Sequence, residues 1–279
     1  MKTASMKRSF RESALSAIPL LMCGSASAQP LDLSLEIAAV HWPGYPGGVQ
    51  YQATVFLSGG VIPGGYDSAG NLLSPGNVWA VGLNSSQTLT FSSLAALKTG
   101  MDAVSPWTIT FYPSSGPEYV ASIPLNLAPL LESEFPPMSI TSPADGAVGV
   151  SPTTAIHWTA PSGYPTAPFY QLDTPATPVE PDYSGSLPAG TTSYSPPAPL
   201  ASGMWNALVS YSKPAPSGVG FEVAPIDSGL ISASGYLMDS ASSGFNVVPE
   251  PSTWAVITGG GLAAFGLVRR ISFKRRSQS

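Results

Sequence analysis

Prolines and glycines cut this chain into short segments, since 30 prolines and 28 glycines stand among its 279 residues. Between them apolar and polar residues alternate, as in 31–37, where leucines and an isoleucine share one face of a strand. Only 92–98 favours a short helix. Further strand-like runs lie at 49–57, 78–83, 88–91, 107–112 and 119–125. We therefore expect a mainly β fold with two sandwich-like domains.

The middle of the chain has enough apolar residues to form folded domains. Hydrophobic residues make up 43% of the sequence, and aromatic and β-branched residues are spread along it, which argues against disorder. Two acids followed by two prolines at 132–137 indicate a linker. We therefore predict a β-rich domain of unrecognised family over 29–135 and a second domain over 136–248.

The end of the second domain gives weaker signals. A turn rich in Pro, Gly and Ser favours a hairpin between 211–213 and 220–223. The segment 226–245 is rich in Ser and Gly and alternates only weakly, so we expect it to hold the last strand and a flexible spacer.

Several short motifs in 136–248 recur in one kind of β-sandwich. They are 140–147, 156–161, 170–173, 187–194 and 203–209. In this order they resemble strands A, B and C, the approach to strand E, and strand F of a fibronectin type III or related Ig-like module. The resemblance implies that Trp158 lies in the core. It also places Trp205 where that family usually has a tyrosine near the start of strand F.

The first 28 residues have the pattern of a cleaved signal peptide. Cations precede the apolar run 14–22, and Ala26-Ser27-Ala28 forms an A-x-A cleavage site that predicts a mature start at Gln29. The only cysteine, Cys23, lies inside this segment, after Met22 rather than the small residue that a lipoprotein needs. We therefore expect a mature chain with no cysteine, and hence no disulfide or thiolate metal site.

The C-terminal tail combines an apolar stretch with a cluster of cations. No charge lies between Trp254 and Val268, and with its flanks the segment 252–270 is long enough for a tilted transmembrane helix. The alternatives are a plain single-pass anchor and a buried helix, but the stretch has no polar face. The cations suit the cytoplasmic side of a membrane and are Arg269, Arg270, Lys274, Arg275 and Arg276.

A short motif, Pro249-Glu250-Pro251, stands just before that apolar stretch. The motif, the hydrophobic helix and the basic end together resemble the PEP-CTERM sorting signal of Gram-negative bacteria, here over 249–279. The resemblance implies an inner-membrane-anchored precursor and recognition by an exosortase-type membrane protease. It further implies cleavage near the motif and transfer to the cell surface or the extracellular polymer matrix.

The part of the chain between these two segments is strongly acidic. Residues 29–248 hold 14 acids and only two bases, Lys98 and Lys213, so their formal charge is −12, against −5 for the whole chain. Such a surface repels nucleic acid and anionic lipid, and we expect no nucleic-acid partner. Simple solubility explains the charge, and contact with cations or neutral polysaccharide is the alternative.

Residues that usually carry catalysis are scarce. His41, expected in a loop, and His157, expected to point outward from a strand, lie in different predicted domains. Glu132 and Glu134 stand in the linker, and a two-carboxylate mechanism is the hardest to exclude because acids need no motif. A further acidic group matches no calcium-loop spacing and comprises Asp173, Glu180 and Asp182. We predict no catalytic residue, metal site or cofactor, and therefore no enzyme.

Aromatic residues in predicted loops suggest a different function. Aromatic faces stack on sugar rings when they are exposed together. The candidates are Trp42, Tyr45, Trp79, Trp107, Tyr164 and Tyr183. The alternative, which we favour for most of them, is that they pack in the cores or against turns. The main prediction is an exported structural or adhesive protein of the surface or matrix. The alternatives are a polysaccharide-binding module in 29–135 and a carboxylate-dependent polysaccharide hydrolase.

Overall fold

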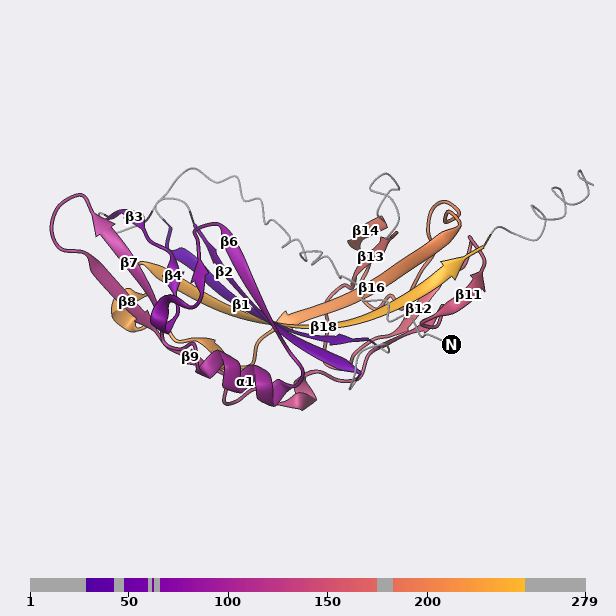
Figure 1. The fold of residues 1–279 in the computed structure, drawn as a ribbon, viewed down its shortest axis with the longest axis horizontal. Helices are drawn as coiled ribbons and strands as arrows, with labels where there is room; N and C mark the ends of the chain where they lie inside the picture. Colours follow the sequence, from indigo (N-terminus) through magenta and orange to yellow (C-terminus); the bar gives the residue numbers. More distant parts are fainter. Residues whose placement is uncertain (1–28, 43–47, 60–61, 63–65, 175–182, 249–279) are drawn as a thin grey trace, which may run out of the picture.

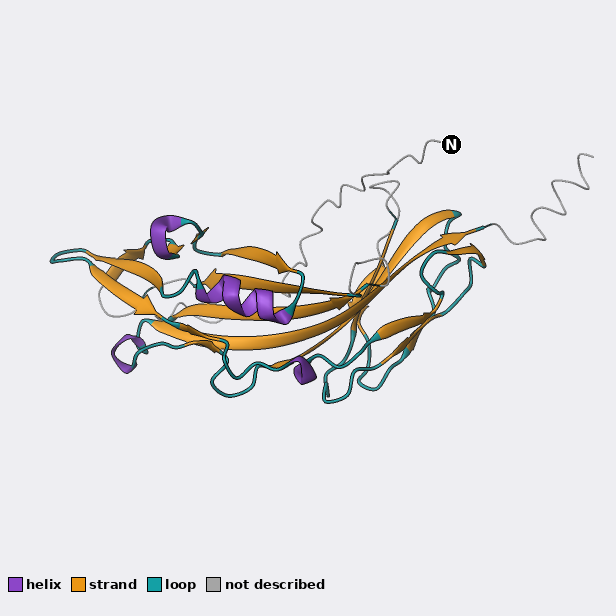
Figure 2. Ribbon diagram, turned by 60° about the horizontal axis from the view of Figure 1, so that its bottom comes forward, coloured by secondary structure: helices purple, strands orange, loops and turns teal. Residues whose placement is uncertain are grey.

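The computed structural model describes residues 29–42, 48–59, 62, 66–174 and 183–248. Regular structure in these residues is nearly all β-strand, with one α-helix and three short 3-10 helices (Figure 2). The body is elongated, and two long strands run through its middle (Figure 1). The prediction of a mainly β fold is confirmed.

The largest sheet takes strands from both halves of the chain. Its order is β14-β13-β16-β18-β1-β2-β6, and β11 pairs with β18 off this path. The bounds of these strands are β1 Leu31–His41, β2 Val49–Ser58, β6 Ser85–Phe91, β11 Ala147–Val150, β13 Phe169–Asp173, β14 Tyr183–Ser186, β16 Gly203–Pro214 and β18 Ile231–Val247. The predicted runs at 31–37 and 49–57 are thus strands, and the alternating apolar residues of β1 are buried.

Strand β18 joins the two halves of the molecule. Its first part pairs in parallel with all of β1, from Leu31↔Ile231 to His41↔Ala241. Its last part pairs antiparallel with β16, up to Gly203↔Val247. The two registers overlap over 236–241, where β18 is paired on both sides. One strand therefore runs without a break along both halves of the body (Figure 1).

The N-terminal core packs β1 and β2 against a five-stranded sheet and helix α1, Leu94–Asp102. The helix begins after Ser93, whose hydroxyl accepts a hydrogen bond from the Ala96 N–H at 3.1 Å, as an N-cap does. It confirms the helix predicted at 92–98 and extends it. The strands of the smaller sheet are β3 Tyr66–Ala69, β4 Leu72–Leu73, β5 Ala80–Val81, β7 Trp107–Pro113 and β8 Tyr119–Ile123, with the 3-10 helix η1 Pro75–Asn77 between β4 and β5.

The C-terminal core lies between β13, β16 and the last part of β18 and a three-stranded sheet of order β10-β12-β15. The bounds of these three strands are Ser139–Ser142, Ile156–Thr159 and Ser193–Tyr194. Trp158 is buried, as expected, and its Nε1–H donates to the Tyr211 hydroxyl at 2.9 Å. That hydroxyl donates in turn to the Thr191 carbonyl at 2.9 Å. The Trp205 indole N–H donates to the Ala201 carbonyl at 2.8 Å.

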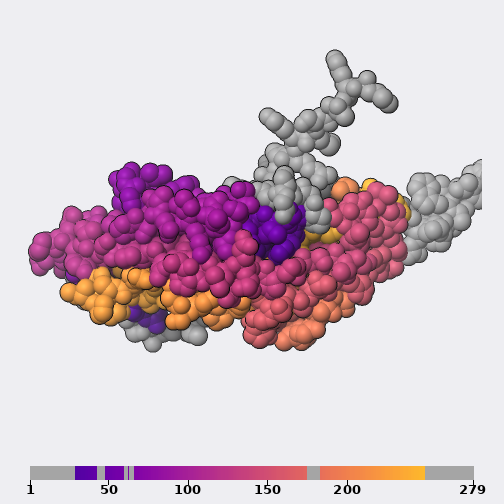
Figure 3. All heavy atoms as spheres, turned by 90° about the horizontal axis from the view of Figure 1, so that it is seen from below, coloured from indigo at the N-terminus to yellow at the C-terminus, as the bar shows by residue number. Residues whose placement is uncertain are grey.

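After β16 the chain returns to the N-terminal core. Strand β17, Gly220–Phe221, pairs with β9, Leu125–Asn126, and the 3-10 helix η3, Pro225–Asp227, follows it. The predicted hairpin between 211–213 and 220–223 is wrong, because β16 pairs with β18 and the apolar side chain of Phe221 is buried in the N-terminal core instead. In the space-filling view this orange segment lies along the magenta part of the chain (Figure 3).

The Ser/Gly-rich segment near the end is one long strand rather than a strand and a spacer. Strand β18 spans 17 residues, and partners on both sides supply the backbone hydrogen bonds that its weak apolar pattern did not predict. Because Ile231 and Leu237 belong to the N-terminal core, the two cores are not divided at a single point of the chain. The first three residues of the predicted linker 132–137 form the 3-10 helix η2, Glu132–Glu134.

Candidate functional site

Most of the predicted targeting residues lie outside the described part of the chain. These are Ala26 and Ala28, the motif Pro249-Glu250-Pro251, the span from Trp254 to Val268, and the cations Arg269, Arg270, Lys274, Arg275 and Arg276. Gln29 is described and exposed. Within the described ranges no helix has the length and hydrophobicity needed to cross a membrane. Cleavage, sorting and insertion therefore stay predictions.

The two histidines have different surroundings. His157 points outward from β12 between buried Ile156 and Trp158, as the alternation predicted. His41 does not lie in a loop: it is the last residue of β1, because β18 continues the pairing up to this residue. Its Nε2 lies 2.8 Å from Oδ1 of Asp239, and only 13% of its side chain is exposed.

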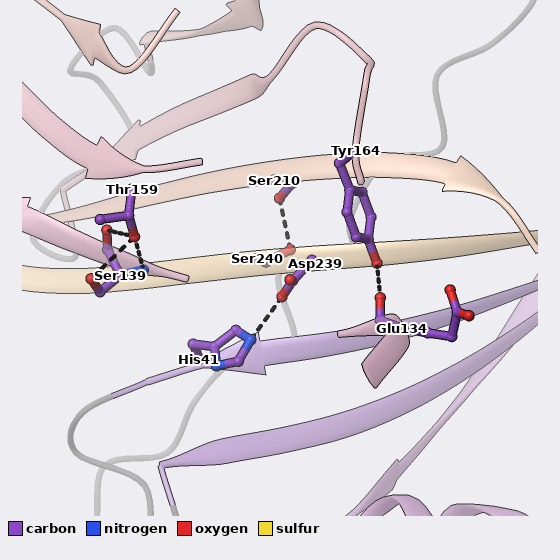
Figure 4. Close-up of polar contacts among 8 residues, drawn as sticks. All are labelled: His41, Glu134, Ser139, Thr159, Tyr164, Ser210, Asp239 and Ser240. Atoms are coloured by element: carbon purple, nitrogen blue, oxygen red, sulfur yellow. Dashed lines mark hydrogen bonds and ion pairs between the residues drawn. The ribbon is translucent and has the colours of Figure 1, made fainter. Parts of the chain in front are cut away.

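Asp239 lies at the point where β18 passes from one core to the other. It is fully buried, on the same side of the strand as Leu237 of the N-terminal core and Ala241 of the C-terminal core. The paired residue on β1 is Ala39 and that on β16 is Tyr211. The carboxylate therefore lies between two apolar clusters, with the His41 imidazole 2.8 Å from one of its oxygens (Figure 4).

An ion pair between Lys213 and Glu134 holds the predicted linker close to the Asp239 carboxylate. Lys213 of β16 places its Nζ 2.7 Å from Oε2 of Glu134 and 4.5 Å from the centre of the Tyr164 ring. The Tyr164 hydroxyl donates to the Glu134 carbonyl at 3.0 Å (Figure 4). Phe135 packs edge-on against Tyr51 of β2, with ring centres 5.6 Å apart. Elements of both cores thus meet around η2, and we call His41, Asp239, Lys213, Glu134 and Tyr164 the joint cluster.

The electrostatics of the joint cluster follow from burial. Burial raises the pKa of the Asp239 carboxyl above its ordinary value, and the His41 hydrogen bond and charge oppose that rise only in part. Burial also raises the pKa of the Tyr164 phenol, and the negative charges of Asp239 and Glu134 add to the effect. The phenol therefore stays protonated, which keeps its donated hydrogen bond to Glu134 at ordinary pH.

The other acids named from the sequence serve local contacts. The amide of Gln171 donates to Oδ2 of Asp173 at 2.7 Å, within β13. Glu132 begins η2, whereas Glu180 and Asp182 fall outside the described residues. In the ranges that the structure describes, no three His, Cys, Asp or Glu side chains group in a way that could hold a metal ion.

The candidate sugar-stacking aromatics do not form one exposed patch. Trp107 is buried in the N-terminal core and Tyr164 in the C-terminal core. Trp79 is half-buried against the first core, and Tyr183 is half-buried beside Trp205, with ring centres 6.4 Å apart. Trp42 is half-buried after β1, and Tyr45 lies outside the described residues. A polysaccharide site built from these side chains stays a prediction.

Sequence reasoning missed the joint cluster because its members are distant along the chain. Asp239 follows Met238 in a Ser-rich run and has no motif around it. The one usable signal was the alternation of side chains along a strand. If 231–247 is a strand, Leu237, Asp239 and Ala241 lie on the same face. The joint cluster connects β1, β16, β18 and η2 through side-chain contacts. Within it the Nε2 atom of His41 faces the Asp239 carboxylate.

Comparisons with known proteins give no family for this chain. No protein-family model matches the sequence, and a search of curated proteins found no match.

Proposed function

We propose that this chain is an exported, non-enzymatic structural protein of the bacterial cell surface or exopolymer matrix. In this proposal a signal peptide is cleaved before Gln29, and the segment 252–270 holds the precursor in the inner membrane. An exosortase-type protease then acts at the PEP-CTERM motif, 249–251. The support is the pair of targeting patterns on either side of an acidic, mainly β body.

The observation that carries the structural role is the continuity of β18. This strand passes through both cores and ends at Val247, two residues before the sorting motif begins. Tension on the C-terminal attachment would run along β18 and load its hydrogen bonds to β1 and β16 together. A strand loaded lengthwise between long partners resists extension better than one peeled from its end. This arrangement suits a protein that transmits force from a surface attachment.

We infer that the C-terminal core is a fibronectin type III or Ig-like module. Sheet β10-β12-β15 corresponds to strands A, B and E, and strands β14-β13-β16-β18 correspond to C′, C, F and G. Trp205, which stands in place of the usual tyrosine of strand F, likewise donates to a carbonyl upstream, that of Ala201. In this assignment the N-terminal core is built on an extended strand G.

The test is fractionation of producing cells combined with mass spectrometry of both ends of the protein. We expect a mature N-terminus at Gln29 and a new C-terminus near 249–251. Changing Pro249 and Pro251 to alanine should retain the uncleaved form in the inner membrane. The matched control, Ser277→Ala beyond the cations, should be processed normally. A protein that stays in the cytoplasm with both ends intact would refute the proposal.

A further inference from the structure

In the part of the chain that the structure describes, the edge of the largest sheet at β6 has no strand partner. Strand β6 is the last in the order β18-β1-β2-β6 (Figure 1). It pairs with β2 over its whole length, from Tyr51↔Phe91 to Leu57↔Ser85, without a shift in register. Among the described residues no strand pairs with its other side. Every second residue of β6 therefore directs its N–H and C=O away from the sheet.

This edge lacks the features that usually protect an edge strand. Natural edges are short, charged, bulged or interrupted by proline. Strand β6 has seven residues, Ser-Ser-Gln-Thr-Leu-Thr-Phe, with no charge, no proline and no bulge. The opposite edge of the same sheet, β14, has four residues and includes Gly185. The two ends of one sheet thus differ in how readily they accept a further strand.

We propose that β6 pairs antiparallel with β6 of a second copy of this chain. A pairing with two-fold symmetry about Thr88 places Thr88 opposite itself, Ser86 opposite Thr90 and Gln87 opposite Leu89. Hydroxyl-bearing residues then face each other on one side of the sheet, and opposed threonines are a favourable cross-strand pair. The three hydroxyl residues of this face, Ser86, Thr88 and Thr90, are all exposed. The Thr88 hydroxyl lies 3.0 Å from the Thr54 hydroxyl on β2, and because a hydroxyl has one donor and two acceptor positions it keeps the capacity for a second contact across the pairing.

The other face of β6 favours the same partner. Leu89 and Phe91 are half-buried at the rim of the N-terminal core. In the symmetric pairing the partner's Leu89 lies opposite Gln87, beside Leu89 and Phe91 of the first copy. Apolar surface that is exposed in the single chain is therefore buried on both copies.

Charge explains why the contact is made at this edge. Residues 29–248 carry a formal charge of −12, so two copies repel each other over most of their surfaces. A strand without charge is where two such bodies can approach without placing carboxylates opposite each other. Added salt should therefore strengthen the contact by screening the remaining repulsion. Among the described strands β6 is the only end strand of this length in the sheet, so the pairing closes as a dimer rather than a fibre.

Cysteine cross-linking of the full chain tests both contact and register. Residues directly opposite in an antiparallel pair have Cβ atoms about 5 Å apart, which is within reach of a disulfide after small adjustment. We expect T88C to give a covalent dimer on non-reducing gels after mild oxidation. T90C should give none, because its opposite residue is Ser86. The matched control S184C lies on the exposed side of β14, and the unaltered chain shows any background from Cys23.

Charge-swapped variants sharpen the test. Adding S86K and T90K to T88C puts lysines opposite each other and should abolish the dimer band. Adding S86E and T90E should do the same, and mixing the two variants should restore a mixed dimer. The proposal is overturned if T88C gives no dimer, if T90C or S184C cross-links as well as T88C, or if the lysine variant still cross-links. Species larger than a dimer would also overturn it if they persist when Cys23 is changed to serine.

Discussion

The buried tryptophans of the two cores differ in whether their indole N–H groups are hydrogen-bonded. In the C-terminal core the indole N–H of Trp158 donates to Tyr211 and that of Trp205 to Ala201. In the N-terminal core Trp107 is equally buried, but no acceptor among the described residues bonds its Nε1–H. Trp107 belongs to a core cluster that is mostly aliphatic, and its ring lies perpendicular to that of Phe221, with ring centres 6.1 Å apart. The buried tryptophans of the C-terminal core are therefore held by burial together with hydrogen bonds, and Trp107 of the N-terminal core by burial alone.

This difference has a consequence for how each core tolerates change. A hydrogen-bonded indole fixes the positions of its partners, so the C-terminal core is specified by geometry as well as by volume. A core held by apolar contact tolerates substitutions that keep its volume. Both cores nevertheless share β18, so they are not independent in stability.

The largest expected effect comes from removing one large aromatic side chain from either core. Trp107→Ala and Trp205→Ala should each lower the free energy of unfolding by about 3–5 kcal/mol, because each leaves a cavity. Since β18 belongs to both cores, each variant should still unfold in one transition. Urea unfolding followed by fluorescence and by circular dichroism measures this. Two separate transitions would show that the cores are not coupled.

The next effect concerns the joint between the cores. His41→Ala should lower the free energy of unfolding by about 3 kcal/mol at neutral pH, because it leaves the Asp239 carboxylate buried without its partner. The control is Asp239→Asn in the same background, which removes the charge and should restore part of the loss. Unfolding experiments at several pH values measure both variants.

The pH dependence of that loss has a definite sign. Burial already raises the pKa of Asp239 above 3.8, and removal of His41 raises it further. The folded state then keeps a proton that the unfolded state releases, so stability falls as pH rises from 3.8 through the folded pKa. The cost of His41→Ala should therefore shrink in acid, where Asp239 is protonated in both states. A cost that grows in acid would contradict this assignment.

The smallest effect tests the contrast between the indoles directly. Trp158→Phe loses the buried hydrogen bond to Tyr211. Trp107→Phe removes an indole N–H that has no acceptor among the described residues. The first should cost about 1 kcal/mol more than the second, since both lose similar volume. Denaturation midpoints of the two variants give the comparison. Equal costs would mean that the Trp158–Tyr211 bond adds nothing to stability.

Local patterns predicted the elements that depend on local features. The alternation in 31–37 predicted β1, the alternation beside Trp158 predicted the outward His157, and 92–98 predicted the start of α1. In each case the buried side of the element is visible in the sequence itself.

Features set by distant parts of the chain escaped prediction. Strand β18 has a weak apolar pattern, and its backbone is stabilised by pairing with β16 and with β1, which lies 200 residues earlier in the chain. His41 was placed in a loop for the same reason, since its strand partner comes 200 residues later. Trp107 was named both at the start of a predicted strand and as a candidate sugar-stacking aromatic, because composition does not distinguish an exposed aromatic from a buried one.

The parallel pairing of β1 with β18 also determines when the N-terminal sheet can be completed during synthesis. Leu31 and Ile231 are register partners, so the first strand emerges from the ribosome long before the strand that completes its sheet. At about 5–20 residues per second this delay lasts roughly 10–40 s. During that interval β1 has β2 as its strand partner but lacks β18, so the sheet around β1 stays incomplete until nearly the whole body has been synthesised.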